Sequence, residues 1–177
     1  ALYNNRQYEV AQLATKMFKK DKVIFMNSGV EACETAVKFA RRWGYRSKMI
    51  PENEAVVVYM KGNFWGRTLT ACGTSDDLSR YKDFGPYDKG AVLIEYNNIE
   101  ALREVLESNP NICAVMAEPI QGEAGFIIPN SNYLLELSKL CKKHNVLYID
   151  DEVQAGMGRS GQLLAYQYSL GHDIQPD

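Results

Sequence analysis

The residues most able to carry chemistry lie in the segment VLYIDDEVQAG, residues 146–156. There an apolar run leads directly into Asp150, Asp151 and Glu152, and Gln154 follows shortly after. A carboxylate at the end of a buried strand needs a partner, because an unpaired charge in a dry setting is very costly or is lost by protonation. The available partners are solvent at the sheet edge, an arginine, a metal ion or the protonated ring nitrogen of a cofactor.

Strand geometry disfavours the metal ion. Neighbouring residues of a strand point to opposite faces, so adjacent acids do not readily share one ion. One acid at the sheet end with a glutamine three residues later fits a different task, in which the acid keeps a heteroaromatic ring nitrogen protonated and the amide contacts a ring substituent. That is how pyridoxal phosphate is made an electron sink.

Two further segments could bind anionic or planar groups. NSGVEA, residues 27–32, offers backbone amides, a helix dipole and the hydroxyl of Ser28 to an anion, although a plain helix N-cap is the simpler explanation. GNFWGRT, residues 62–68, places two aromatics that could stack on a planar ligand beside Arg67, whose planar fork suits a carboxylate. A packed loop with a structural salt bridge explains the second segment equally well.

A proline- and glycine-rich turn, EPIQGEAG, carries Glu118 and Glu123. Paired carboxylates on a rigid loop could perform glycoside hydrolysis. Taken singly, each glutamate is better explained as an exposed acid of a turn, since the sequence shows no environment that would perturb it.

Alternating helical and extended patterns must position these segments. Apolar periodicity predicts helices over 5–19, 33–45, 99–108 and 131–144, and strands over 22–26, 55–60, 91–96, 112–118 and 146–150. Short continuous apolar strands separated by helices favour a three-layer α/β architecture with a mostly parallel sheet covered on both faces. Ligand sites in such sheets lie at the carboxyl ends of the strands, where all four segments above fall.

Composition excludes several classes of protein. A chain of 177 residues with 46% hydrophobic content suffices for one sizeable core. Its net charge of −2 argues against nucleic acid as a partner. Four cysteines without CxxC spacing and only two histidines disfavour zinc and indicate reduced thiols inside a cell. No membrane-length apolar run, signal peptide pattern or GxGxxG after a strand occurs, so membrane insertion, secretion and dinucleotide binding are not expected.

The order and wording of NSGVEA, GNFWGRT, EPIQGEAG and DDEVQAG resemble the class III, or ω-amino acid, aminotransferases of fold type I. Within that family, YNNRQYE, NSGVEACETAVKFARRWGY, KGNFWGRTL and FGPY are similar to the members that act on ornithine. The resemblance implies that residues 1–177 form the central part of a large, cofactor-binding domain. Because both ends of the chain read as cut, we expect an N-terminal segment, the catalytic-lysine region and a C-terminal small domain outside it.

For the cofactor, pyridoxal 5'-phosphate, the resemblance implies a site of six residues: Ser28, Gly29, Val30, Phe64, Asp151 and Gln154. The first three hold the phosphate through backbone amides, and the aromatic stacks on the pyridine ring. Asp151 pairs with the pyridinium nitrogen and Gln154 lies near the phenolic oxygen. Asp150 departs from the small residue that the family has there, so either acid of the pair could face the ring.

For substrates, the resemblance implies that Arg67 contacts a carboxylate, with Trp65 beside the stacking aromatic. Glu123 matches the glutamate that masks a second arginine, so that the ω-amine is presented for reaction. Glu118 is expected to support the binding residues without contacting the ligand itself. The family's Schiff-base lysine is expected shortly after residues 175–177, yet no lysine follows Lys143. We therefore expect the 177-residue chain to be inactive by itself.

For the complete enzyme, the resemblance implies transfer of the δ-amino group of L-ornithine to 2-oxoglutarate, giving glutamate 5-semialdehyde and glutamate. An acetylornithine or 4-aminobutyrate aminotransferase is the nearest alternative, and a non-catalytic, truncated homologue acting as a dimer partner is an alternative of another class. We expect a homodimer in the cytosol or mitochondrial matrix, with amino acid and 2-oxo acid substrates and no nucleic acid or membrane partner.

Overall fold

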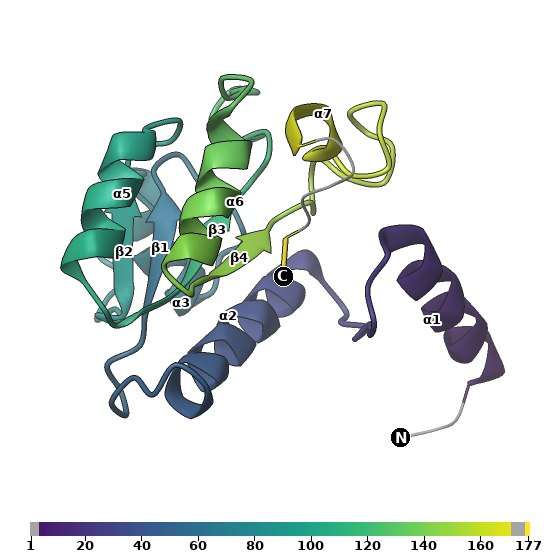
Figure 1. Ribbon diagram of the computed structural model, residues 1–177, viewed down its shortest axis with the longest axis horizontal. Helices are drawn as coiled ribbons and strands as arrows, with labels where there is room; N and C mark the ends of the chain where they lie inside the picture. The colour runs from purple at the N-terminus through teal and green to yellow at the C-terminus, as the bar shows by residue number, and fades with distance from the viewer. Residues whose placement is uncertain (1–3, 171–175) are drawn as a thin grey trace.

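The computed structural model describes residues 4–170 and 176–177, and its centre is a four-stranded sheet (Figure 1). The strands are β1 (Val56–Met60), β2 (Ala91–Ile94), β3 (Ile112–Ala117) and β4 (Leu147–Asp150), in the order β2-β1-β3-β4. All three strand pairs are parallel. The loops that follow β1, β3 and β4 therefore leave the sheet at the same edge.

Helices cover both faces of this sheet (Figure 1). One face packs against α2 (Gly29–Arg46), and the other packs against α5 (Ile99–Ser108) and α6 (Tyr133–Lys143). The remaining helices are α1 (Asn5–Phe18), α3 (Leu69–Gly73), α4 (Leu78–Tyr81) and α7 (Gln167–Leu170). The predicted three-layer α/β architecture with a parallel sheet is confirmed.

The core has two halves because side chains alternate across each strand. Val58 and Val115 face α5 and α6, where Leu102 and Leu137 are fully buried. The neighbouring strand residues face α2: Val57, Tyr59, Ala114 and Met116. All six residues of β3 are buried, as its position inside the sheet requires.

The predicted strand over residues 22–26 is wrong. These residues form no strand, and the side chains of residues 24–26 are exposed, with Ile24 at 54%. A strand needs a neighbour for its backbone hydrogen bonds, and none of the four described strands pairs with this segment. Residues 172–177 read in the sequence as a connection before a further element, but residues 172–175 lie outside the described chain.

The first helix extends away from the sheet (Figure 1). It begins after Asn4, whose side chain accepts a hydrogen bond from the backbone N–H of Arg6, and it buries none of its residues. Val10, Leu13 and Met17 are exposed. The apolar side that the sequence predicts is thus present but uncovered within the described residues.

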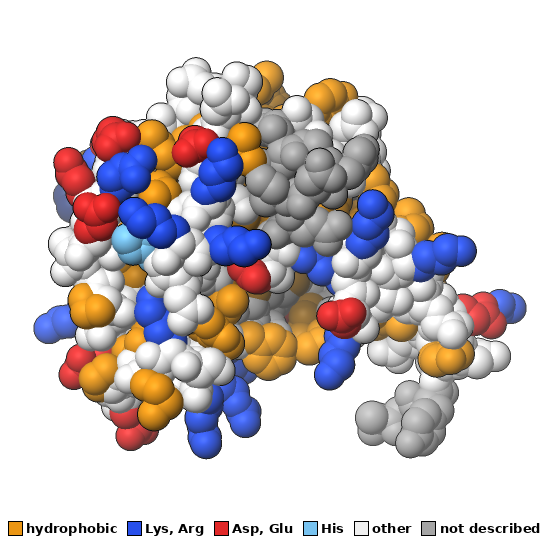
Figure 2. All heavy atoms as spheres, in the orientation of Figure 1, with side chains coloured by type: hydrophobic (Ala, Val, Ile, Leu, Met, Phe, Trp, Pro, Cys, Tyr) orange, Lys and Arg blue, Asp and Glu red, His pale blue; other side chains and the backbone are white. Residues whose placement is uncertain are grey.

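Side chains of both charges are interspersed on the face shown in Figure 2. Within residues 4–170 and 176–177, no helix combines the length and apolar character needed to cross a bilayer. The same residues contain no group of three histidine, cysteine or acidic side chains arranged to hold a metal ion.

Leu137 tests the core formed by α6 and the sheet. Its side chain is 0% exposed, so Leu137→Ala should lower the free energy of unfolding by about 2 to 5 kcal/mol through lost burial and a residual cavity. Urea unfolding measures this change. Leu78→Ala is the matched control, because Leu78 is 70% exposed and its truncation should change stability little. Equal effects of the two variants would contradict the packing described here.

Candidate functional site

Three loops meet at the carboxyl ends of the strands and are joined by side-chain hydrogen bonds. Glu118, after β3, accepts a hydrogen bond at Oε1 from the backbone N–H of Phe64 after β1, with 3.0 Å between nitrogen and oxygen. Gln154, after β4, donates from Nε2 to Oε1 of Glu123, at 3.4 Å. These contacts bring together the segments GNFWGRT, EPIQGEAG and DDEVQAG, which lie far apart in the sequence.

The N-terminus of α2 joins the same edge. Ser28 is its N-cap: the side-chain oxygen accepts from the backbone N–H of Glu31 at 3.3 Å, and Glu31 in turn accepts from the backbone N–H of Asn27 at 2.7 Å. The plain cap explanation of NSGVEA is therefore correct for the Ser28 hydroxyl. The helix dipole and the first backbone amides still point toward this edge, as an anion site requires.

Two glycines let the loops approach the start of α2. A Cβ on Gly29 would lie 2.7 Å from Cγ1 of Val153, and a Cβ on Gly66 would lie 2.2 Å from Cγ2 of Val30. The φ angle of Gly66 is +147°, a conformation that residues with side chains rarely adopt. The chain therefore packs Gly29 and Val30, which follow Ser28, directly against the loops after β4 and β1.

Asp151 is a buried acid at the end of β4, with 5% of its surface exposed. Its Oδ1 accepts from the backbone N–H of Val153 at 3.1 Å, and its Oδ2 accepts from the Sγ of Cys33 at 3.6 Å. Burial raises the pKa of Asp151, and these two donors partly oppose the rise. No arginine, lysine or histidine of the described chain forms a salt bridge with it.

Asp150 lies on the opposite face of β4. Its Oδ1 accepts from the hydroxyl of Tyr148 at 3.1 Å, and Tyr148 belongs to the core beneath α6. Burial, followed by the nearby carboxylate of Glu152, raises the pKa of Asp150 well above its ordinary value. Of the two adjacent acids, Asp151 is thus the one that shares a face with α2 and the start of that helix.

Glu118 is not the exposed turn acid that the sequence suggested, since it is only 5% exposed. Its second oxygen accepts from the backbone N–H of Gly122 at 3.3 Å, so the carboxylate joins its own turn to the loop after β1. Burial raises the pKa of Glu118 to about 7. Glu123, by contrast, is exposed, as expected.

Two arginines flank the ring of Phe64. The guanidinium carbon of Arg67 lies 5.7 Å from the ring centroid and that of Arg80 lies 4.7 Å from it. Arg67 is exposed and therefore available to a ligand carboxylate. Trp65 points into the core instead, where its Nε1 donates to the hydroxyl of Thr74 at 2.8 Å. The expected contact of Trp65 with a substrate stays a prediction.

Sequence reasoning missed two of these neighbours. Cys33 lies four residues after Gly29 on α2, so helical spacing alone could have indicated that the two residues share a face. Arg80 reaches Phe64 only because α3 and the following turn fold back, and no local pattern encodes that approach. Its Nε also pairs with Asp77 at 3.1 Å, which holds the side chain in place.

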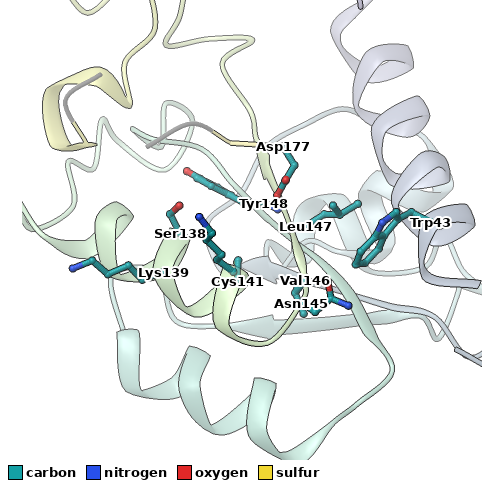
Figure 3. Close-up of a pocket in the computed structure, with 10 residues that line it drawn as sticks. Trp43, Ser138, Lys139, Cys141, Asn145, Val146, Leu147, Tyr148 and Asp177 are labelled. Carbon is teal, nitrogen blue, oxygen red and sulfur yellow. Dashed lines mark hydrogen bonds between the residues drawn. The ribbon is translucent and has the colours of Figure 1, made fainter. Parts of the chain in front are cut away.

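Several hollows border β4. One of about 350 Å³ borders Asp151, Cys33 and Val153, but its lining includes neither Phe64 nor Gln154, so it adjoins the candidate site without containing all of it. A larger pocket of about 560 Å³ lies at the amino end of β4, between the C-terminal parts of α2 and α6 (Figure 3). Because loops and helix N-termini meet at the other end of the sheet, we assign the candidate site there.

The chain matches known proteins along its whole length. Residues 1–177 match the family described as aminotransferase class-III. Mitochondrial ornithine aminotransferase from Drosophila ananassae is 51% identical over 100% of this chain and 40% of its own length, and the Rattus norvegicus protein is 48% identical over 100% and 39%. The chain therefore spans about 40% of the length of the curated relatives it matches.

Solved structures of aminotransferases also match the chain along nearly its whole length. Ornithine aminotransferase from Toxoplasma gondii, described with partial occupancy of PLP at its active site, superposes with a TM-score of 0.95 at 41% identity over 99% of this chain and 40% of that one. Acetylornithine aminotransferase from Elizabethkingia anophelis gives a TM-score of 0.81 at 42% identity over 99% and 39%.

The raised pKa of Glu118 predicts a pH-dependent cost to folding. Between its ordinary pKa of 4.5 and about 7, the folded protein holds a proton that the unfolded chain has released, so stability falls as pH rises through this window. Relative to Glu118→Gln, the native protein should lose roughly 2 to 3 kcal/mol of unfolding free energy between pH 4.5 and 8. Urea unfolding across this range measures the difference. Glu123→Gln, which alters an exposed acid of the same turn, should not change the slope.

Proposed function

This chain belongs to the class-III aminotransferase family, and on that premise we propose that the full-length protein transfers the δ-amino group of L-ornithine to 2-oxoglutarate. The products are glutamate 5-semialdehyde and glutamate. Identities of 45–51% to proteins named ornithine aminotransferase support this substrate, together with the close superposition on the Toxoplasma gondii enzyme. The observation that carries the proposal is the buried Asp151 carboxylate, which has no basic partner among the described residues.

The described residues fit pyridoxal 5'-phosphate. Asp151 meets the requirement for an anion that keeps a ring nitrogen protonated, because it is buried and lacks a competing cation. When bound, the cofactor supplies an electron sink for the pair of electrons left by deprotonation of the substrate. The first backbone amides of α2, from Ser28 to Val30, would hold its phosphate, Phe64 would stack on its ring, and Gln154 would reach its phenolic oxygen.

The substrate side of the proposed site is more open. Arg67 and Glu123 are both exposed, which suits groups that bind and release a small charged molecule. We assign Arg67 to a substrate carboxylate and Glu123 to the masking of a second arginine from outside this chain. Glu118 supports the site by joining two of its loops.

We also propose the domain organisation, the oligomeric state and the location of the full-length protein. Residues 1–177 would be the central part of the large cofactor-binding domain, and the full-length protein would act as a homodimer. A location in the cytosol or mitochondrial matrix fits the several relatives that are named mitochondrial. The Schiff-base lysine would come from residues beyond the 177 considered, since no lysine follows Lys143.

The substrate can be tested on the purified full-length protein. With pyridoxal 5'-phosphate bound, its visible absorbance band should shift on adding ornithine, and kcat/KM should be at least tenfold higher for ornithine than for N-acetylornithine or 4-aminobutyrate. A preference for N-acetylornithine would favour the second candidate, which the Elizabethkingia anophelis structure supports. Absence of a cofactor band would favour a non-catalytic homologue.

The role of Asp151 can be tested by substitution in the full-length protein. Asp151→Ala should lower turnover by several orders of magnitude while leaving the fold intact, because the ring nitrogen would lose the anion that keeps it protonated. Asp150→Ala is the matched control, since Asp150 is the adjacent, half-buried acid and lies on the other face of β4. Circular dichroism checks folding of both variants. Near-normal turnover of Asp151→Ala would reject the assignment.

A further inference from the structure

Among residues 4–170 and 176–177, Cys33 is the one side chain that donates a hydrogen bond to Asp151. Its Sγ lies 3.6 Å from Oδ2, and both residues are buried. The contact joins the second turn of α2 to the end of β4, across 118 residues of sequence. The thiol also borders the hollow beside Asp151.

We propose that Cys33 is a positioning residue. Its thiol orients the Asp151 carboxylate, which contacts the cofactor, and favours the charged form of that carboxylate. The inference rests on the proposed function, because Asp151 acts on a ring nitrogen only if that cofactor binds. Two donors from different elements orient the carboxylate: the backbone N–H of Val153 at Oδ1 and the thiol of Cys33 at Oδ2. With both oxygens engaged, rotation of the carboxylate is restricted.

The thiol is suited to this task because it stays protonated. Burial, and then the negative charge of Asp151, raises the pKa of Cys33. A thiol is a weak hydrogen-bond donor. It can therefore stabilise the Asp151 anion and still leave lone pairs of the carboxylate free for a stronger donor such as a protonated ring nitrogen. A hydrogen bond to the charged form also favours that form, so the thiol opposes the rise in the Asp151 pKa that burial causes.

The other titratable groups around Asp151 are all acidic. Glu118 faces it from the loop after β3, and Glu152 and Asp150 are its neighbours on its own segment. Each of these carboxylates makes ionisation of Asp151 harder. Donors such as the Cys33 thiol therefore favour the charged form of Asp151 before a cationic ring nitrogen binds to it.

The experiment uses the full-length protein in cofactor-free and cofactor-bound forms. The Asp151 carboxyl is titrated by carbon NMR of the cofactor-free protein labelled at the aspartate carboxyl carbon, and Asp151→Asn identifies its signal. Cofactor affinity is measured by titration with pyridoxal 5'-phosphate. Cys33→Ala should raise the Asp151 pKa by roughly half a unit to one unit and weaken cofactor binding several-fold.

Two further variants make the result decisive. Cys33→Ser keeps a donor and should return both readouts toward the native values, which separates the hydrogen bond from packing. Cys113→Ala removes another buried thiol, one that donates to the carbonyl oxygen of Val56 at 3.3 Å, and should change neither readout.

The outcomes distinguish this inference from the proposed function. An Asp151 pKa in Cys33→Ala equal to that in Cys113→Ala overturns the role of Cys33, as does a shifted pKa with unchanged cofactor affinity. If Asp151→Asn itself leaves cofactor affinity and turnover unchanged, the proposed function fails, whatever Cys33 does. A loss in Cys33→Ala that Cys33→Ser does not recover would assign the effect to packing and also reject the inference.

Discussion

The buried charge of Asp151 is the constraint on which the site depends. An ionised carboxylate that is almost fully removed from water is tolerated only where donors or a cation compensate for its lost hydration. The described chain supplies two donors and no basic side chain, which leaves one interaction unfilled. We propose a protonated ring nitrogen of the cofactor as the partner of this carboxylate. The sheet, the helix start and the loops together hold this carboxylate in place.

Close approach of the loops follows from small residues at the positions where backbones meet. Gly29 and Gly66 leave room for Val153 and Val30, so the start of α2 is packed between the loops after β1 and β4. Glu118 then joins two loops through backbone donors on both of its oxygens. The groups proposed to hold the phosphate, the ring and its nitrogen thus lie on segments that cannot move independently. Such preorganisation is what a site for a charged cofactor requires.

Local patterns were enough for much of this arrangement. Apolar runs and their spacing predicted the strands, the helices over α5 and α6, and the edge at which the polar segments gather. The segment over residues 22–26 failed because an apolar run reports strand propensity but not the presence of a pairing partner. Glu118 was misjudged for a similar reason: its burial depends on a loop 54 residues away. Arg80 became visible only in three dimensions, since a tertiary contact brings it to Phe64. Cys33, by contrast, could have been found from its helical spacing to Gly29.

The alternation of side chains along β4 places two consecutive acids in separate environments, one beneath α2 and one beside Tyr148. A single inserted or deleted residue in this strand would exchange them, sending the wrong carboxylate to each side. The site therefore depends more on the number of residues in β4 than on which apolar residues the strand contains. Many apolar substitutions within the strand would be tolerated, whereas one change in residue count would abolish the site while preserving every residue type in it.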